Sequence, residues 1–241
     1  MFEIGKGDVD WENPINLSYV INNGINNPNC FGSPDPSFEP LRLDDFVGSI
    51  DKGSPVNFYN IFLNPHGSTT HTECVGHILS GFVLHECLNQ YLFNAYLLDV
   101  EISQNDEGDW VIHLDRMQLN WNKEVKACIL RIINWNKEDI RYTGNNPPYL
   151  TLESVIRLRD RGIEHLLVEL PSIDKEKDEG KLAGHRAWWN VIGEIRINST
   201  ITELIRVPAN IKQGYYVLNL QVLRIHLDVS PSNPVLYTYK S

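Results

Sequence analysis

Apolar and β-branched residues gather in short runs along the chain, and turn-forming residues separate these runs. The length and composition of a run of this kind are typical of a β-strand. We predict strands for the runs at residues 58–63, 92–102, 110–114, 126–133 and 165–170. The tail at residues 214–229, GYYVLNLQVLRIHLDV, alternates between apolar and polar positions, so we interpret it as one long strand.

Two segments have the features of helices. Thr151 can cap a helix that continues through Arg161, and Gly162 supplies a stop before the apolar run that follows. A second helix is predicted at residues 185–192. Because a helix followed by a buried strand is half of a βαβ unit, the simplest assembly is a mixed-sheet α/β domain with mostly antiparallel strands and a few helices.

The first part of the chain has a different character. Residues 10–40 are rich in Asn, Pro and Gly, which favour turns and irregular structure over helix. We therefore expect residues 1–45 to form an irregular N-terminal arm with one short strand near residues 15–21. This arm belongs to a single domain that spans residues 1–241, since 241 residues suit one large domain.

Composition and charge exclude several classes of protein. The formal net charge of -10 argues against a nucleic-acid partner, because such proteins need clustered Lys and Arg. No run approaches the ~20 apolar residues of a membrane span, and the amino terminus lacks the pattern of a secretory signal. We therefore expect no membrane partner and a cytoplasmic location. Buried free thiols are expected at most of the four cysteines, which have no CxxC spacing: Cys30, Cys74, Cys87 and Cys128.

The segment NPHGSTTHTECVGH, residues 64–77, concentrates histidines beside one acidic residue. His71 and Glu73 would leave the same face of an extended chain, whereas Glu73 and His77 would share one face of a helix. His66 precedes Gly67, which allows a tight turn toward the same point. Imidazole and carboxylate together suit Zn, Mn or Fe better than Mg or Ca. The alternative is a capped helix start with solvated polar side chains, and this segment alone leaves both interpretations open.

Two further residues support a metal site. His185 follows Gly184 after an acidic loop, and Glu203 lies in the otherwise apolar stretch STITELI. A buried carboxylate without a partner is costly, so Glu203 is expected to have a charged partner or a metal. The alternative for Glu203 is an edge-strand carboxylate that faces water.

The order and context of these residues resemble the cyclase family of metal-dependent hydrolases, which includes bacterial kynurenine formamidase and isatin hydrolase. HGSTTHTECVGH is similar to the family signature H-x-G-T-H-x-D-x-P-x-H, and INLSYVI, FGSPDPSFEP, VELPSID, LAGHRAWW and ITELI are similar to other family segments. The resemblance runs almost end to end. It departs from the signature in one additional residue between His66 and His71, in Glu73 for Asp and in Val75 for Pro, which indicates a divergent branch.

The resemblance implies a fold, a ligand set and a catalytic residue. The fold is the swivelling β/β/α type. His66, His71 and Glu73 would bind one metal ion, and two further ligands, His185 and Glu203, would complete a neighbouring one. The resemblance implies one or two Zn or Mn ions per subunit, a homodimer or homotetramer, and His77 as the catalytic histidine outside the metal shell.

The chemistry implied is hydrolysis of a C–N bond other than a peptide bond, as in an arylformamidase. A small-molecule formamide or cyclic amide would be attacked by a metal-activated water, with His77 as general acid and base. Two alternatives remain: a metal-binding module without turnover, and a cyclase or dehydratase that acts on a carbonyl substrate. Three aromatic residues could line a pocket for a planar substrate or pack in the core: Phe31, Trp188 and Trp189.

Overall fold

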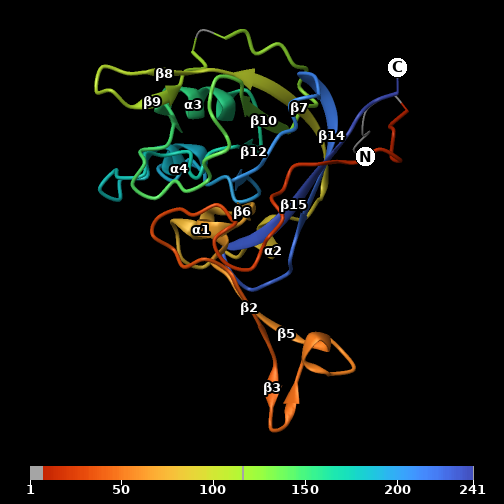
Figure 1. The fold of residues 1–241 in the computed structure, drawn as a ribbon. Helices are drawn as coiled ribbons and strands as arrows, with labels where there is room; N and C mark the ends of the chain where they lie inside the picture. The colour runs from red at the N-terminus through yellow and green to blue at the C-terminus, as the bar shows by residue number, and fades with distance from the viewer. Residues whose placement is uncertain (1–7, 116, 241) are drawn as a thin grey trace.

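A closed, barrel-like sheet forms the centre of the protein (Figure 1). The computed structural model describes residues 8–115 and 117–240. Around the ring the strands follow the order β15 (Val229–Tyr237), β14 (Gly214–Val222), β7 (Leu92–Val100), β10 (Ala127–Ile132), β12 (His165–Val168), β13 (Thr200–Glu203) and β6 (His71–Glu73). A second pairing, between β6 and β15, closes the ring, and β1 (Ile15–Asn16) extends it beside β15.

The sheet is mixed, and antiparallel pairings outnumber parallel ones around the ring by only four to three. β7, β10, β12 and β13 run parallel to one another, whereas β14, β15 and β6 form antiparallel pairs with their neighbours. Parallel neighbours need long crossover connections. The chain from β10 to β12 carries α3 (Leu152–Asp160), and the chain from β12 to β13 carries α4 (Ala183–Trp188). A small second sheet of β8 (Ile102–Gln104), β9 (Trp110–Ile112) and β11 (Tyr149–Leu150) lies in the crossover segments.

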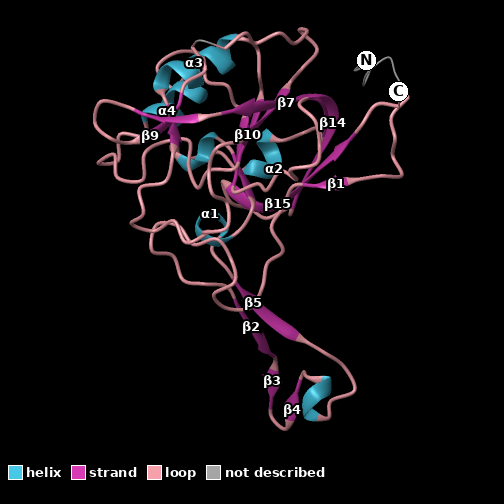
Figure 2. Ribbon diagram, turned by 45° about the horizontal axis from the view of Figure 1, so that its top comes forward, coloured by secondary structure: helices cyan, strands magenta, loops and turns pink. Residues whose placement is uncertain are grey.

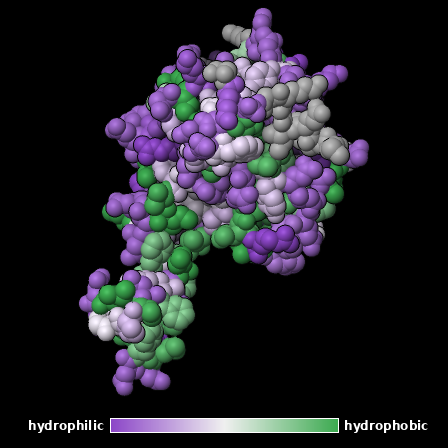
Figure 3. Space-filling model, turned by 90° about the vertical axis from the view of Figure 1, so that its right-hand side faces the viewer, coloured by the Kyte–Doolittle hydropathy of each residue, from purple (hydrophilic) through white to green (hydrophobic). Residues whose placement is uncertain are grey.

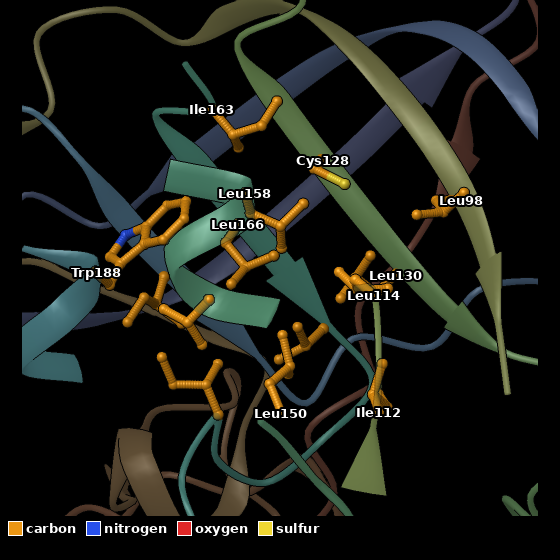
Figure 4. Packing of buried hydrophobic residues seen from close by; sticks show 14 of the residues in the cluster. Leu98, Ile112, Leu114, Cys128, Leu130, Leu150, Leu158, Ile163, Leu166 and Trp188 are labelled. Atoms are coloured by element: carbon orange, nitrogen blue, oxygen red, sulfur yellow. The ribbon is translucent and has the colours of Figure 1, made fainter. Parts of the chain in front are cut away.

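Two apolar clusters fill the faces of the sheet. Along β10, Cys128 and Leu130 face one cluster and Ile129 faces the other, as the two-residue period of a strand requires. The first cluster lies beneath α3, where Leu158 packs toward Leu166 of β12 (Figure 4). The predicted helix is confirmed, because Thr151 caps α3 by accepting a hydrogen bond from the backbone N–H of Ser154 at 3.3 Å.

Most predicted strands are confirmed, and the tail is corrected. Residues 214–229 do not form one strand, because β14 ends at Val222 and β15 begins at Val229 after a turn. Apolar and polar residues keep alternating through this turn, so the sequence does not show where β14 ends. Pro231 and Pro234 lie within β15, and prolines are typical of loops rather than of strand interiors. The second helix is shorter and earlier than predicted, since α4 ends at Trp188. All four cysteines are buried free thiols, as predicted for most of them.

The N-terminal segment first packs along the body and then projects away from it as a hairpin. β1 is shorter than the predicted strand, and Leu17 directly after it is fully buried. Residues 37–62 then extend away from the body as a long hairpin (Figures 1 and 2). We call this segment the projecting hairpin; it contains β2 (Ser37–Pro40), β3 (Arg42–Leu43), β4 (Phe46–Val47), a 3-10 turn (Ile50–Lys52) and β5 (Tyr59–Phe62). None of the helices in the described part of the chain has the length and apolarity needed to cross a membrane.

His165 at the start of β12 is buried and predicts a dependence of stability on pH. Its Nδ1 lies 2.9 Å from Thr200 Oγ1, and its ring packs on Phe93 with centroids 4.0 Å apart. Burial, together with the charges of Arg196 and Lys126, lowers the pKa of His165 to about 3. In the unfolded chain His165 takes up a proton near pH 6.5, whereas the folded chain resists protonation down to about pH 3. The stability that the neutral, buried His165 contributes is therefore fully present above pH 6.5 and is lost as the pH falls toward 3.

We therefore expect the free energy of unfolding to fall by about 2–3 kcal/mol between pH 6.5 and pH 4.5 because of His165. Urea unfolding of chelator-treated protein at a series of pH values measures this loss. The variant His165→Gln should lack that part of the slope, whereas His113→Gln, at a side chain 45% exposed, should keep it. Equal slopes in the wild type and His165→Gln would contradict the account.

Candidate metal centre

A short helix directs the first histidine into the site. Asn64 caps the start of α1 (Pro65–Ser68), because its side chain accepts a hydrogen bond from Gly67 N at 3.1 Å. His66 on this helix places Nδ1 3.3 Å from Glu73 Oε2. A Cβ added to Gly67 would lie 1.9 Å from Ser33 Oγ, so the close contact between α1 and the N-terminal segment depends on glycine.

β6 supplies two side chains from one face of a strand. His71 and Glu73 alternate on this strand, which lies between β13 and β15. His71 Nδ1 lies 2.9 Å from the carbonyl oxygen of Thr69 and donates to it, which leaves Nε2 available to a metal. Nε2 lies 3.4 Å from Glu203 Oε2. Glu203 ends β13, and its Oε1 accepts a hydrogen bond from Ile173 N at 2.9 Å.

α4 brings His185 to the same point. Its Nδ1 lies 2.6 Å from Asp174 Oδ2, and Asp174 also accepts hydrogen bonds from the backbone N–H groups of Gly184 and His185. This arrangement fixes the ring, so that Nε2 lies 3.1 Å from Glu73 Oε1 and 3.9 Å from Glu203 Oε1. Asp174 therefore acts through His185, as the outer carboxylate partners of metal-binding histidines do.

His77 and Asp228 form the open edge of the site. His77 ends a 3-10 turn after β6, and its Nδ1 lies 3.5 Å from both Glu73 Oε2 and Asp228 Oδ2. His66 Nε2 lies 3.4 Å from the same oxygen of Asp228. The side chains of His66, His77 and Asp228 are 28–29% exposed, whereas Glu73 is fully buried. Solvent and ligands can therefore reach the site from this edge.

The polar atoms of the buried residues lack ordinary partners. Glu73 Oε1, Glu73 Oε2 and His71 Nε2 are buried without a hydrogen bond of normal geometry. Each orphaned group of this kind costs free energy. Ligand atoms of three overlapping groups lie within 4.8 Å of one another: His66, His71 and Glu73; Glu73, His77 and His185; His66, His77 and Asp228. Nitrogen and carboxylate oxygen lone pairs that converge in this way fit a divalent transition metal.

The charges of the site balance one another. Burial opposes ionisation of Glu73, but His185 and His66 outweigh it and hold the pKa of Glu73 well below its usual range. Burial likewise opposes a charge on His66, while Asp228 and Glu73 raise its pKa to about 9. His66 and His77 lower the pKa of Asp228. The ionised, buried carboxylates are therefore stabilised only by nearby positive charge, which protonated imidazoles or a metal cation can provide.

All six residues that the sequence indicated lie together in the structure: His66, His71, Glu73, His77, His185 and Glu203. The two alternative interpretations required solvent-exposed side chains, which the structure does not show. The histidine segment does begin with a capped helix, but His71 and Glu73 are 0% exposed. Glu203 does not face water, because it is 3% exposed. Trp188 and Trp189 are fully buried core residues, whereas Phe31 is 50% exposed.

The sequence patterns did not indicate Asp228 or Asp174 as site residues. Asp228 lies in the turn between β14 and β15, a stretch that was interpreted as the inside of one strand, and no local pattern marks it. Asp174 ends the segment VELPSID, which does resemble a family motif and so carried a usable signal. Glu169 in the same segment is structural, since its carboxylate accepts hydrogen bonds from Ile132 N and Val207 N.

Asp174 provides a test of ligand positioning. We expect Asp174→Asn to weaken metal binding by about 10–100-fold, because His185 loses the carboxylate that orients its ring. Titration with Zn in competition with a chromophoric chelator measures this change. Glu179→Gln, at a side chain 83% exposed, is the matched control and should bind as the wild type does. Wild-type affinity in Asp174→Asn would show that His185 is no ligand.

Comparison with known proteins places the chain among related folds. The family model described as "Putative cyclase" matches residues 15–175. A potential metal-dependent hydrolase with cyclase activity shares the fold at a TM-score of 0.65 and 13% identity, over 95% of this chain and 99% of that chain. An isatin hydrolase bound to the product analogue thioisatinate is similar at a TM-score of 0.65 and 16% identity, over 94% and 92% of the two chains.

A predicted metal-dependent hydrolase from Bacillus stearothermophilus is similar at a TM-score of 0.58 and 14% identity, over 93% of this chain and 98% of that chain. No curated protein matches the sequence. At these identities the structural similarity shows the fold alone. The activity has to be inferred from the geometry of the site in this chain.

Proposed function

Because the chain belongs to the "Putative cyclase" family, we propose that it is a metal-dependent hydrolase that cleaves an amide bond in a formamide or a cyclic amide. One observation carries the proposal. Glu73 is fully buried with neither carboxylate oxygen hydrogen bonded, and three imidazoles lie 3.1–3.5 Å from it. A protein retains such a costly arrangement where a cation is to be bound.

Two sets of residues would hold the metal. His66, His71 and Glu73 form one set, and the second set is completed by His185 and Glu203, with Glu73 central to both. Imidazole and carboxylate ligands of this kind suit Zn or Mn. When bound, a divalent metal of this type supplies a nucleophilic water at neutral pH and polarises the carbonyl group of the substrate.

His77 is the residue best placed to transfer protons. Its ring is 28% exposed at the open edge, where a substrate enters, and Asp228 Oδ2 lies 3.5 Å from Nδ1. His185, in contrast, is 2% exposed and fixed by Asp174. His77 can therefore take a proton from the attacking water and pass it to the leaving nitrogen, which departs as an amine.

The substrate class rests on chemistry and on one relative. Isatin hydrolase is among the structural relatives, and isatin is a cyclic amide. Phe31 is 50% exposed, and its neighbour Cys30 donates its backbone N–H to Gly67 O of α1 at 2.8 Å, so the Phe31 ring is available to contact a planar substrate. Phe31 adopts a left-handed backbone conformation with φ 56°, which is costly for an aromatic residue and is typical of positions retained for function.

A substrate screen tests the proposed function. Formyl-anilides, lactams and lactones are incubated with protein loaded with Zn or with Mn, and products are followed by chromatography. We expect amide hydrolysis that a chelator abolishes and that Zn or Mn restores. Protein that binds metal but converts no amide would favour the non-catalytic module, whereas dehydration or cyclisation without hydrolysis would favour the other alternative.

A further inference from the structure

A cavity with a surplus of positive charge opens on this acidic chain. The formal net charge of the chain is -10, and the face drawn in Figure 3 is mainly hydrophilic, with much of its apolar surface on and beside the projecting hairpin. A cavity of about 520 Å³ lies at the end of β10 and is lined by residues of the segments 131–137 and 206–209. It shares no residue with the metal centre, so it is a separate site. A cavity of this volume can hold a small organic ligand.

Two of the three cations that line the cavity are paired with carboxylates. Arg131 forms a bidentate pair with Asp99, at 2.6 and 2.8 Å, and donates to the carbonyl oxygen of Pro208 at 3.1 Å. The ammonium group of Lys137 lies 2.6 Å from Glu169 Oε2. These contacts tie the end of β10 to the segment after β13 and give the cavity a fixed wall. Because each of the two pairs is neutral as a unit, the third cation sets the net charge of the cavity.

Arg206 is the third cation, and its charge has no partner among the described residues. The guanidinium group makes no ion pair or hydrogen bond with them, and it lies over the ring of Tyr19, with Cζ 5.7 Å from the centroid. The described residues that line the cavity include no Asp or Glu. An exposed guanidinium keeps its charge at neutral pH, and its planar N–H donors match the geometry of a carboxylate. The cavity therefore carries one unpaired positive charge with unused donors.

Trp135 gives the cavity an aromatic wall. Its indole ring is partly buried and packs on Tyr142, with the ring centroids 5.7 Å apart, which fixes the orientation of the ring. The Nε1–H group makes no hydrogen bond with a described residue. Ile133, which also lines the cavity, is 55% exposed although it is a large apolar residue. A planar ring in a ligand can cover this apolar surface and stack on the indole, which stabilises a complex beyond the area that is buried.

We propose that this cavity binds a small aromatic carboxylate. The carboxylate pairs with Arg206, and the aromatic ring packs against Trp135 and Ile133. A single negative charge matches the one unpaired cation, whereas a phosphate monoester carries nearly two negative charges at neutral pH. Hydrolysis of a cyclic amide also produces a carboxylate, so the product of the proposed reaction can belong to this class of ligand. Binding in the cavity does not rest on the metal chemistry.

Calorimetric titration of the Zn-loaded chain with benzoate tests the proposal, and we expect saturable binding at a single site. Benzamide has the same ring without the charge and should bind at least about 10-fold more weakly, because the charge-assisted hydrogen bonds to Arg206 are lost. Acetate has the charge without the ring and should also bind at least about 10-fold more weakly. Chelator-treated protein should give the same Kd for benzoate, because the metal centre lies outside the cavity.

The variant Arg206→Gln tests which residue binds the carboxylate. It should weaken benzoate binding by at least about 10-fold and leave the weak binding of benzamide unchanged. Its circular dichroism spectrum and zinc content should match the wild type, because Arg206 is exposed and belongs to no group of possible metal ligands. Arg224→Gln is the matched control, at another exposed arginine, and should bind benzoate as the wild type does.

Four results would each overturn the proposal. They are a wild-type chain that binds no benzoate, benzoate binding that requires Zn, equal affinity for benzoate and for either benzamide or acetate, and wild-type affinity for benzoate in Arg206→Gln.

Discussion

Replacing Glu73 by Gln is expected to abolish metal binding and hydrolysis together. The substitution keeps the size of the side chain but removes the negative charge that lies within 3.1–3.5 Å of His66, His77 and His185. A neutral amide also brings two N–H donors into a cluster that needs acceptors. We expect metal affinity to fall by more than about 100-fold, which exceeds the effect of losing an outer carboxylate.

The measurement compares metal content and rate on the same preparations of Glu73→Gln and of the exposed control Glu179→Gln. The control should match the wild type in both quantities. Retention of full metal content by Glu73→Gln would remove Glu73 from the ligand set. Loss of metal with unchanged turnover would show that the hydrolysis does not depend on this centre.

Replacing His77 by Asn is expected to lower turnover without lowering metal content, whereas Glu73→Gln lowers both. Metal content should stay close to that of the wild type, because the ligand set of His66, His71, Glu73, His185 and Glu203 is intact. Turnover of an amide substrate should fall by about 10²–10⁴-fold, the contribution of a positioned general acid and base. His85→Asn is the control, since His85 belongs to none of the three groups of possible ligands and its Nε2 lies 3.2 Å from His226 Nδ1.

The structure makes this experiment informative, because His77 Nδ1 is as close to Glu73 as a ligand would be, at 3.5 Å. If His77→Asn loses metal as well as activity, His77 is a ligand and the division of roles is wrong. If the variant keeps full activity, another group transfers the proton. Each result is read from elemental analysis and initial rates at saturating substrate.

Local chemistry explains what the sequence could predict. The start of α3 follows from Thr151, because a cap acts within one turn of helix. His71 and Glu73 share a face because strand geometry repeats every two residues, so their spacing predicts that the two side chains converge. The segment alone did not decide between a metal site and solvated polar side chains. The local contexts of His185 and Glu203 singled these residues out. Their place in one ligand set came from the family resemblance, which carries information about tertiary structure that spacing alone lacks.

Long-range pairing explains what the sequence could not predict. β6 pairs with β13 on one side and with β15 on the other, and this register brings Glu203 opposite His71. No pattern within β6 specifies those partners. Residues 223–228, which carry Asp228, continue the apolar and polar alternation of β14, so the sequence does not mark them as a turn. Asp228 reaches the site because β15, which follows this turn, pairs with β6 and closes the ring. β5 has the composition of a buried strand, yet the structure leaves all four of its residues exposed.

The ratio of bound metal to protein tests the central claim most directly. Chelator-treated wild-type chain is incubated with Zn, separated from free ions by gel filtration and analysed by mass spectrometry of the element. The account predicts about one or two ions per chain, with Glu73 at the centre of both ligand sets. A chain that is folded by circular dichroism and holds no ion after incubation with Zn, or with Mn, would contradict it.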